Sequence, residues 1–318
     1  MKNKKLKVVI FGSTGFIGKN MVEYFHTKKN IQVIATYHNG KKFTKKGVKW
    51  KKIDLCIPKQ VERITKNVDI IIQAAAATSG SKDIINNPQK HVTDNAIMNS
   101  NIMKSAYENK VKHVIFFSCT VMYPSSKYGL SENSVKLNAK LNPKYFGVGH
   151  TKLYIEKICE FFSNLGNTKY TCIRHSNIYG PHDKFDLEKG HFFASNLFKI
   201  YKTKKDNITV WGKGHEKRDL LYISDLTNFI DKVLKFQKAK FKIYNCTYGK
   251  SLRVIDVINK MIRSFQKKIK IQHDLSQPSI PVNILVNSKK ANNELRWKPK
   301  INIDDGIRRT IKWLAQNM

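Results

Sequence analysis

The sequence predicts an α/β fold built on a doubly wound parallel sheet, with a smaller α/β lobe formed by the C-terminal third. Short strand-like runs alternate with helix-length segments through the first 175 residues, and this alternation is typical of βαβ units. The runs are apolar and rich in β-branched residues without polar alternation, as in strands that are buried on both faces. The first run leads directly into a glycine-rich turn and a helix.

The elements predicted in the first 175 residues follow one another in a regular order. Strands are expected at 7–12, 31–38, 51–55, 68–76, 112–119 and 170–180. Helices are expected at 18–28, 61–67, 94–110 and 151–166. After about residue 175 the order becomes irregular, with a helix at 192–202, a strand at 208–212, a strand and helix within 219–236 and an amphipathic helix at 306–318.

Composition excludes several classes of protein. A chain of 318 residues with 41% hydrophobic residues is long enough and apolar enough to form a large core or two modest ones. No apolar run reaches the about 20 residues of a membrane span, and we expect a cytoplasmic protein without membrane contact. The five cysteines are scattered without a Cys-x-x-Cys pair, which predicts reduced thiols and no metal site.

The formal net charge of +36 is the most unusual total. Such a charge raises the alternative of a nucleic-acid partner. The positive residues are mostly Lys and are spread along the whole chain, whereas bidentate phosphate recognition favours Arg. We therefore expect a solvated basic surface, which would also attract an anionic small substrate such as a nucleotide diphosphate.

The turn after the first strand predicts a dinucleotide site. Its glycines suit a tight turn, a close approach of the backbone to a diphosphate and close packing of the helix on the strand. The N-terminus of the helix offers N–H groups to the phosphates. The predicted cofactor residues of this segment are Gly12, Ser13, Thr14, Gly15, Phe16, Ile17 and Gly18.

A dinucleotide site sets the domain division. We assign residues 1–175 to a Rossmann-type dinucleotide-binding domain, which 206–247 is expected to join. Residues 176–205 and 248–318 are then expected to form a substrate-binding lobe.

Three further strand ends bear on the cofactor. The second strand ends at His38 without a carboxylate, and Lys41 and Lys42 follow; an acidic residue there would bind the ribose of NAD, so we predict NADP, with NAD as the alternative. Asp54 and Leu55 at the third strand end are expected to hold the adenine. The small side chains of Ala74, Ala75 and Ala76 would let a cofactor lie against the backbone.

Taken together, the glycine turn, "IDL", "QAAAA", "FFSCTVMYP" and "TKLYIEK" resemble the extended short-chain dehydrogenase/reductase (NAD-dependent epimerase/dehydratase) family. "RHSNIYGPHDKFDLEKGHF" and "ITVWGKGHEKRDLLYISDL" narrow the resemblance to its GDP-L-fucose synthase branch, over residues 7 to about 235. That branch is NADP-dependent and epimerises and reduces GDP-4-keto-6-deoxymannose. The resemblance implies a GDP-sugar or other nucleotide-sugar substrate and a homodimer.

The resemblance also implies roles for individual residues. Lys152 matches the lysine that holds the nicotinamide ribose and lowers the pKa of a catalytic Tyr. His191 matches the acid of the epimerisation step. The positions that match the lining of the GDP-sugar pocket are Asn177, Lys199, Trp211 and Arg218.

Three positions depart from the family pattern. Cys119 occupies the place of the catalytic Ser, with Thr120 beside it assigned to the substrate. Val121 stands where the family has its epimerase base, and Val148 stands where it has the catalytic Tyr. Neither valine can move a proton, so a double epimerisation is not expected.

Several groups are alternatives to the missing Tyr. Tyr145 lies seven residues before Lys152, and the glycines at 147 and 149 predict that 145–149 is a loop from which Tyr145 reaches inward. The other candidates are Cys119, Tyr123, His191 or water.

Three readings of the function remain open. The first is an NAD(P)-dependent nucleotide-sugar epimerase, reductase or dehydratase, acting on a GDP-linked 4-keto deoxy sugar or heptose for surface glycans. The second is a catalytically impaired relative that binds a nucleotide sugar or cofactor without redox chemistry. A nucleic-acid-binding protein is the third and weakest reading.

Overall fold

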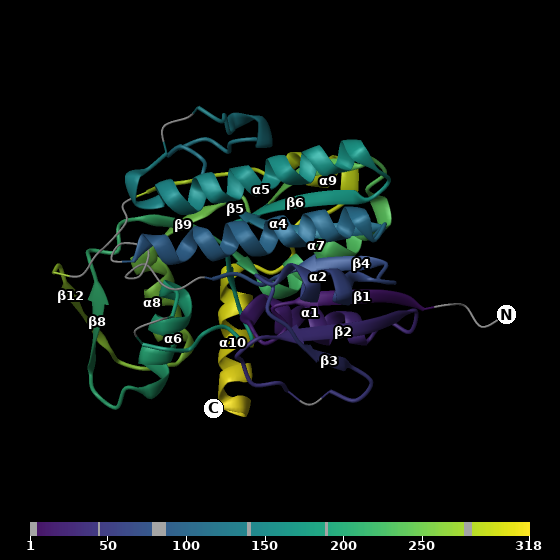
Figure 1. Ribbon diagram of the computed structural model, residues 1–318. Helices are drawn as coiled ribbons and strands as arrows, with labels where there is room; N and C mark the ends of the chain where they lie inside the picture. Colours follow the sequence, from purple (N-terminus) through teal and green to yellow (C-terminus); the bar gives the residue numbers. More distant parts are fainter. Residues whose placement is uncertain (1–4, 44, 78–86, 139–140, 188–189, 277–281) are drawn as a thin grey trace.

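The computed structural model describes residues 5–43, 45–77, 87–138, 141–187, 190–276 and 282–318. Its centre is a seven-stranded parallel sheet with the strand order β10-β6-β5-β4-β1-β2-β3. The chain winds outward in both directions from β1, and the loops on either side of this reversal leave a crevice at the carboxyl ends of the strands. The prediction of a doubly wound Rossmann-type sheet is confirmed (Figure 1).

The strands of the large sheet are short and the helices that connect them are longer. The strands are β1 (Leu6–Phe11), β2 (Ile31–Tyr37), β3 (Lys49–Lys52), β4 (Ile70–Gln73), β5 (His113–Cys119), β6 (Lys169–His175) and β10 (Phe241–Cys246). The helices associated with them are α1 (Phe16–His26), α2 (Pro58–Thr65), α4 (Thr93–Glu108), α5 (Phe146–Leu165), α7 (Ile223–Phe236) and α9 (Lys289–Leu295).

Alternate residues of a strand enter two different cores, which is why the strands are apolar throughout. In β1, Val8 and Ile10 pack with α1 and α7 on one face of the sheet. Val9 and Phe11 pack with α2, α4 and α5 on the other face. All four side chains are fully buried, as expected for a central parallel strand.

The smaller lobe contains two short sheets. One has the order β11-β9-β7 and the other pairs β12 with β8. Their strands are β7 (Asn177–Tyr179), β8 (Asn207–Trp211), β9 (Lys217–Tyr222), β11 (Ser251–Arg253) and β12 (Lys270–Asp274), and their helices are α6 (Phe192–Lys202), α8 (Val254–Ser264) and α10 (Ile303–Asn317). Figure 1 shows β8, β12, α6 and α8 beside the large sheet, near the end where the carboxyl ends of its strands lie.

The stretch 206–247, which we expected to join the first domain, divides between the two parts. β8 and β9 pair within the small sheets, whereas α7 packs on α1 and β10 pairs with β6. No helix among the described residues is long and apolar enough to cross a membrane.

The prediction that 145–149 is a loop is wrong. α5 begins at Phe146, so Gly147 and Gly149 lie inside its first turns. A Cβ on Gly147 would lie 2.8 Å from Val92 Cγ2, and one on Gly149 would lie 2.6 Å from Leu141 Cδ1. These glycines let the start of the helix pack closely against neighbouring segments and do not break it.

Candidate functional site

The turn after β1 brings its backbone against the carboxyl end of β4. Gly12 has a φ of 70°, and a Cβ there would lie 2.6 Å from Ala75 Cα. A Cβ on Gly18 would overlap the carbonyl oxygen of Gly12. Both positions therefore require glycine, because a side chain at either would push α1 away from the strand ends.

A cleft of about 520 Å³ lies over this turn. The predicted cofactor residues that line it are Gly12, Thr14, Gly15, His38, Asp54, Leu55, Ala74, Ala75 and Ala76. α1 starts at its N-cap Gly15 with no capping side chain and no acidic residue in the first turn. The N–H groups there and the positive end of the helix suit an anionic diphosphate, and the residues present fit a dinucleotide.

Three of the predicted cofactor residues, Ser13, Phe16 and Ile17, do not line the cleft and instead pack toward the core. Ser13 is fully buried; its hydroxyl donates to the Ile10 carbonyl at 2.7 Å and its N–H donates to the Thr36 carbonyl at 3.0 Å. Phe16 and Ile17 are partly buried and pack against the core beside α1. Their side chains shape the cleft indirectly.

Cations surround the outer end of the cleft. A second cavity of about 820 Å³ shares His38 and Asp54 with the first, and its walls also include Lys51, Lys52 and Arg63. His38 Nε2 lies 3.8 Å from Asp54 Oδ2, and the other oxygen of Asp54 accepts the N–H of the cysteine two residues later at 2.9 Å. β2 ends at Tyr37 without a carboxylate, so this end is strongly basic.

The loop after β4 is held by an amide side chain from α4. Asn95 Oδ1 accepts the N–H of Ala77 at 3.0 Å, and Asn95 Nδ2 donates to the Ala77 carbonyl at 2.8 Å. Asn95 is buried. These two bonds fix the small residues of the β4 end as a flat wall of the cleft.

Lys152 stands beside β5, one helical turn after Val148. Its Nζ donates to the Phe117 carbonyl at 2.7 Å and lies 4.7 Å from the centre of the Phe116 ring. Burial lowers the pKa of Lys152, and the nearby Cys119 opposes this shift. Burial likewise raises the pKa of the Cys119 thiol, so this sulfur is kept protonated.

A small cavity of about 60 Å³ lies beside the segments that follow β5 and β6. It is lined by Thr120, Val121, Tyr145, Asn177 and Arg218, among others. Burial raises the pKa of Tyr145, and Arg218 partly opposes the shift. The structure thus brings together five positions that the sequence placed at the reacting sugar or at its nucleotide.

Arg218 and Asn177 are fixed by backbone carbonyls. Arg218 Nη1 donates to the Val282 carbonyl at 3.0 Å, and Asn177 Nδ2 donates to the Asp219 carbonyl at 3.0 Å. Asp219 is buried, and it accepts three backbone N–H groups at 2.6 to 3.0 Å. The guanidinium of Arg218 therefore belongs to a fixed wall.

The remaining predicted residues lie outside these cavities. His191 is the N-cap of α6 and is exposed. Lys199 Nζ donates to the Thr209 carbonyl at 3.0 Å and lies 5.7 Å from the centre of the Trp211 ring. Lys199 and Trp211 thus form one unit in the smaller lobe, in which α6 packs against β8.

His175 is a site residue that the sequence reasoning missed. It ends β6 and pairs in register with Cys119 at the end of β5. Burial, followed by the charges of Lys152 and His191, lowers the pKa of His175 to about 4. Little in the sequence signals this role, because His175 lies inside the strand predicted at 170–180; only the observed end of β6 places it beside Cys119.

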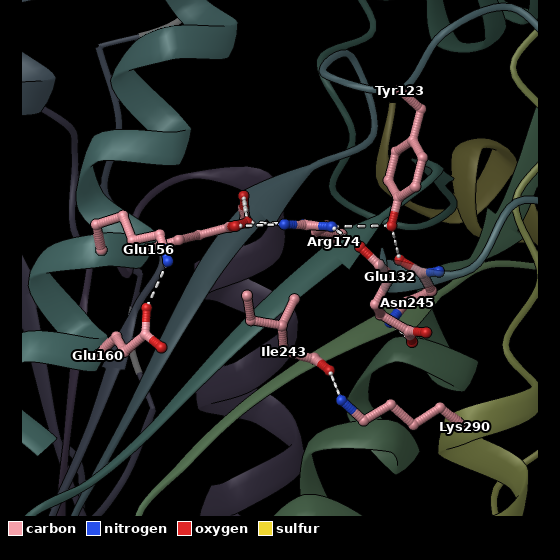
Figure 2. A network of polar contacts seen from close by, with 10 residues as sticks. Tyr123, Glu132, Glu156, Glu160, Arg174, Ile243, Asn245 and Lys290 are labelled. Atoms are coloured by element: carbon pink, nitrogen blue, oxygen red, sulfur yellow. Dashed lines mark hydrogen bonds and ion pairs between the residues drawn. The ribbon is translucent and has the colours of Figure 1, made fainter. Parts of the chain in front are cut away.

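A buried polar network lies behind these strand ends (Figure 2). Arg174 forms two hydrogen bonds to Glu156, from Nε at 2.9 Å and Nη2 at 2.6 Å, and both side chains are nearly inaccessible to water. Ser118 Oγ donates to the same carboxylate at 2.7 Å. Arg174 Nη1 also donates to the Tyr123 hydroxyl at 3.1 Å. The network joins α5, β5, β6 and the segment after β5.

The far side of the network reaches β10 and the residues before α9. The Tyr123 hydroxyl donates to Asn245 Oδ1 at 2.6 Å (Figure 2). Asn245 Nδ2 in turn donates to the Asn287 carbonyl at 3.1 Å. Glu132 Oε1 accepts the N–H of Asn245 at 2.8 Å. The network therefore connects the ends of β5 and β6 with β10 and with the segment before α9.

Comparisons with known proteins show which family this chain resembles. A model of the NAD-dependent epimerase/dehydratase family matches residues 8–247. The GDP-L-colitose synthase of Yersinia pseudotuberculosis is 26% identical over 316 residues, covering 97% of this chain and 97% of the relative. The GDP-L-fucose synthase of Azorhizobium caulinodans is 24% identical over 315 residues, covering 98% and 96%.

Solved structures show the same fold. The UDP-glucose 4-epimerase of Thermotoga maritima matches with a TM-score of 0.86 at 19% identity, covering 98% of this chain and 99% of that one. The resemblance stated from the sequence motifs is confirmed: the chain belongs to the NAD-dependent epimerase/dehydratase family, whose members act on nucleotide sugars.

Proposed function

We propose that this chain is an NADP-dependent oxidoreductase that interconverts a hydroxyl and a ketone on a GDP-linked deoxy sugar or heptose, for the synthesis of surface glycans. The observation that carries the proposal is the joint position of two cavities at the carboxyl edge of one sheet. One is the glycine-lined cleft and the other is the cavity that contains Tyr145 and Arg218. Two relatives with GDP-sugar names cover almost the whole chain.

Each residue group has a proposed role. The turn from Gly12 to Gly18 and the end of β4 hold the diphosphate and ribose, and a bound nicotinamide would supply or accept the hydride. Lys152 orients the nicotinamide ribose. Arg218 binds the sugar diphosphate, since a guanidinium matches phosphate oxygens in two directions.

The remaining residues are assigned to the sugar and to the nucleotide of the substrate. Thr120, Tyr145 and Asn177 face the sugar, and the thiol of Cys119 lies where the family has a hydroxyl. The pair of Lys199 and Trp211, together with His191, is proposed to cover the nucleotide. These assignments rest on the residues that line the cavity and on the resemblance.

NADP is preferred to NAD because of the charge at the outer end of the cleft. Lys51, Lys52 and Arg63 line the cavity that follows His38, and β2 ends without a carboxylate. A 2′-phosphate would meet these cations, and Asp54, the carboxylate in the same lining, lies 3.8 Å from His38.

The test is an assay with NADPH and GDP-4-keto-6-deoxymannose that follows the loss of reduced nicotinamide absorbance. Turnover by the native chain is expected. Tyr145→Phe is expected to raise KM by about tenfold, the usual scale of one hydrogen bond to a substrate. Tyr128→Phe is the matched control, because Tyr128 is 82% exposed. Binding of both ligands without turnover would contradict the proposal.

The second candidate is a binding protein that has lost redox chemistry. Val121 and Val148, at the positions of the family's base and Tyr, are the observations that favour it. If it is correct, the native chain binds NADPH and GDP but does not turn over, and Val148→Tyr gains reductase activity. Nucleic-acid binding would instead show affinity that falls steeply with salt.

We also propose a homodimer through α4 and α5. These helices lie side by side on one face of the sheet (Figure 1). Their exposed large apolar residues are Ile97, Phe146, Tyr154, Phe161 and Leu165, each between 42% and 63% exposed. Light scattering should give a dimer for the native chain and a monomer for Phe161→Glu, while Leu275→Glu, at another exposed apolar position, stays dimeric.

A further inference from the structure

Three groups that can carry a proton, those of His175, Cys119 and Lys152, lie near the carboxyl ends of β5 and β6. His175 ends β6 and is paired in register with Cys119 of β5. In parallel strands, paired residues point to the same face, so the imidazole and the thiol share a face. The charge of Lys152 is close enough to His175 to lower its pKa. His175 is partly exposed.

The ring of His175 is held in one tautomer. Its Nδ1 lies 2.7 Å from the carbonyl oxygen of Ser176. A carbonyl only accepts, so Nδ1 carries the proton of this bond, and in the neutral ring Nε2 keeps a lone pair. The ring also meets Phe117 edge to face, with 6.0 Å between centroids. The imidazole is thus fixed in position and tautomer before any ligand binds.

The other candidates are less suited to the transfer of a proton. Burial raises the pKa of Tyr145, the opposite of what a proton-exchanging tyrosine needs. Burial also raises the pKa of Cys119. His191 is exposed, and among the described residues none holds its ring by a hydrogen bond.

We propose that His175 is the proton-transfer group of this site: its Nε2 exchanges a proton with the sugar oxygen on the carbon that undergoes hydride transfer. The inference rests on the proposed function and replaces the group that Val148 lacks. In the oxidation of a hydroxyl, the O–H bond breaks, its proton goes to Nε2, and the hydride of the carbon passes to an oxidised nicotinamide dinucleotide. In the reduction, the imidazolium returns the proton to the oxygen as hydride arrives.

The groups around His175 set the direction of its pH dependence. Lys152 on α5 and His191 before α6 are the cationic groups that face it, and Cys119 on β5 is neutral. Burial and the charges of Lys152 and His191 favour the neutral ring, whereas the hydrogen bond to the Ser176 carbonyl opposes this pKa shift. The imidazolium is therefore scarce above the pKa of about 4, and kcat/KM for ketone reduction should fall about tenfold per pH unit between pH 5 and 8. A tyrosine donor would give a flat profile over this range.

The experiment uses the full chain, NADPH and GDP-4-keto-6-deoxymannose. His175→Ala is expected to lower kcat by about 10²-fold, the scale of general acid–base help. Added imidazole at pH 6 should restore part of the rate, and the pH dependence should disappear. His150→Ala is the matched control, because His150 packs on Phe146 of its own helix and should leave the rate unchanged.

Two readouts do not depend on turnover. The dissociation constant of NADPH, followed by its fluorescence, should be the same for native chain and His175→Ala. In ¹⁵N spectra of the ring nitrogens, one histidine that is absent from the variant should be neutral with Nδ1 protonated at pH 7. A His175 signal with Nε2 protonated, or a midpoint above pH 6, would overturn the proposal.

The outcomes separate this inference from the function on which it rests. Native turnover that persists within threefold in His175→Ala overturns the proton assignment and leaves the function intact. A loss without imidazole rescue, accompanied by weaker NADPH binding, makes His175 a structural residue and also overturns it. Binding of both ligands without any native turnover overturns the function and this inference together.

Discussion

The two halves of the sheet edge differ in how they relate to their family. At the ends of β1, β2 and β4, the glycine turn and the alanines match the family pattern and line one cleft. At the ends of β5 and β6, two positions of the family's proton chemistry are Val121 and Val148, while His175 and a buried ion pair stand close by. The contrast teaches that the binding of a cofactor and the movement of a proton are separable properties of this fold.

The largest expected effect concerns the buried ion pair of Arg174 and Glu156, which lies behind the ends of β5 and β6. Glu156→Ala leaves Arg174 buried without its partner, and removal of one member of a buried pair costs about 3–5 kcal/mol. We expect a loss of this size in the free energy of unfolding, measured with urea. Glu160→Ala on the same helix removes an exposed pair with Lys157 and should cost under about 0.5 kcal/mol. Equal losses of unfolding free energy in the two variants would show that the buried pair contributes no more to stability than the exposed pair.

The first half is tested by Gly18→Ala. The new Cβ would overlap the carbonyl oxygen of Gly12, and overpacking of this kind costs about 1–3 kcal/mol. Thermal unfolding should show the loss, and NADPH binding should weaken because the diphosphate turn moves. At Gly15 an added Cβ would lie 3.3 Å from the same oxygen, so Gly15→Ala should retain most of the stability. Unchanged NADPH binding in Gly18→Ala would place the cofactor elsewhere.

The loss of stability in acid is the next expected effect, and a histidine at each end of the central strands contributes to it. Burial lowers the pKa of His113 at the start of β5 to about 3, and burial lowers that of His175 at the end of β6 to about 4. A histidine with a depressed folded pKa stabilises the fold fully above its unfolded value, and this stabilisation is lost as the pH falls toward the folded value.

Between pH 7 and 5 each of these histidines should therefore cost about 2 kcal/mol of unfolding free energy, from a penalty of about 1.4 kcal/mol per unit. His175→Ala should halve the difference between stabilities measured with urea at the two pH values. If the native chain is equally stable at pH 7 and 5, neither imidazole is held neutral.

The smallest effect sharpens the choice of cofactor in the first half. Arg63→Ala should raise the dissociation constant of NADPH about fivefold, as expected for one partly exposed charge pair, and should leave that of NADH unchanged. Lys59→Ala, an exposed position on the same helix, should change neither. Equal affinity of the native chain for NADH and NADPH would argue for NAD.

The sequence predicted those features that depend on neighbours along the chain. The turn at Gly12 and the burial of strands such as β1 follow from local pattern, and both are present. The start of α5 was missed because Gly147 and Gly149 are helix-weakening residues in isolation, whereas here they admit Val92 and Leu141. That contact is made by distant segments, and no local pattern contains it.

His175 was missed for a related reason. Its neighbours Lys152, Cys119 and His191 come from three other segments, and it is the register of β5 with β6 that brings Cys119 to it. The pair of Arg174 and Glu156 was missed in the same way, since an ordinary charge in the sequence gives no sign that it is buried.

The buried pair has a consequence for how this chain changes over generations. Arg174 and Glu156 lock α5 to β6 from within the protein, and neither Val121 nor Val148 takes part. Mutations at those two positions can therefore be accepted without loss of the folded state. In proteins with such a buried pair, a reactive side chain can be replaced by another while the fold is kept. Related sequences would then share the buried pair more consistently than the reactive residues.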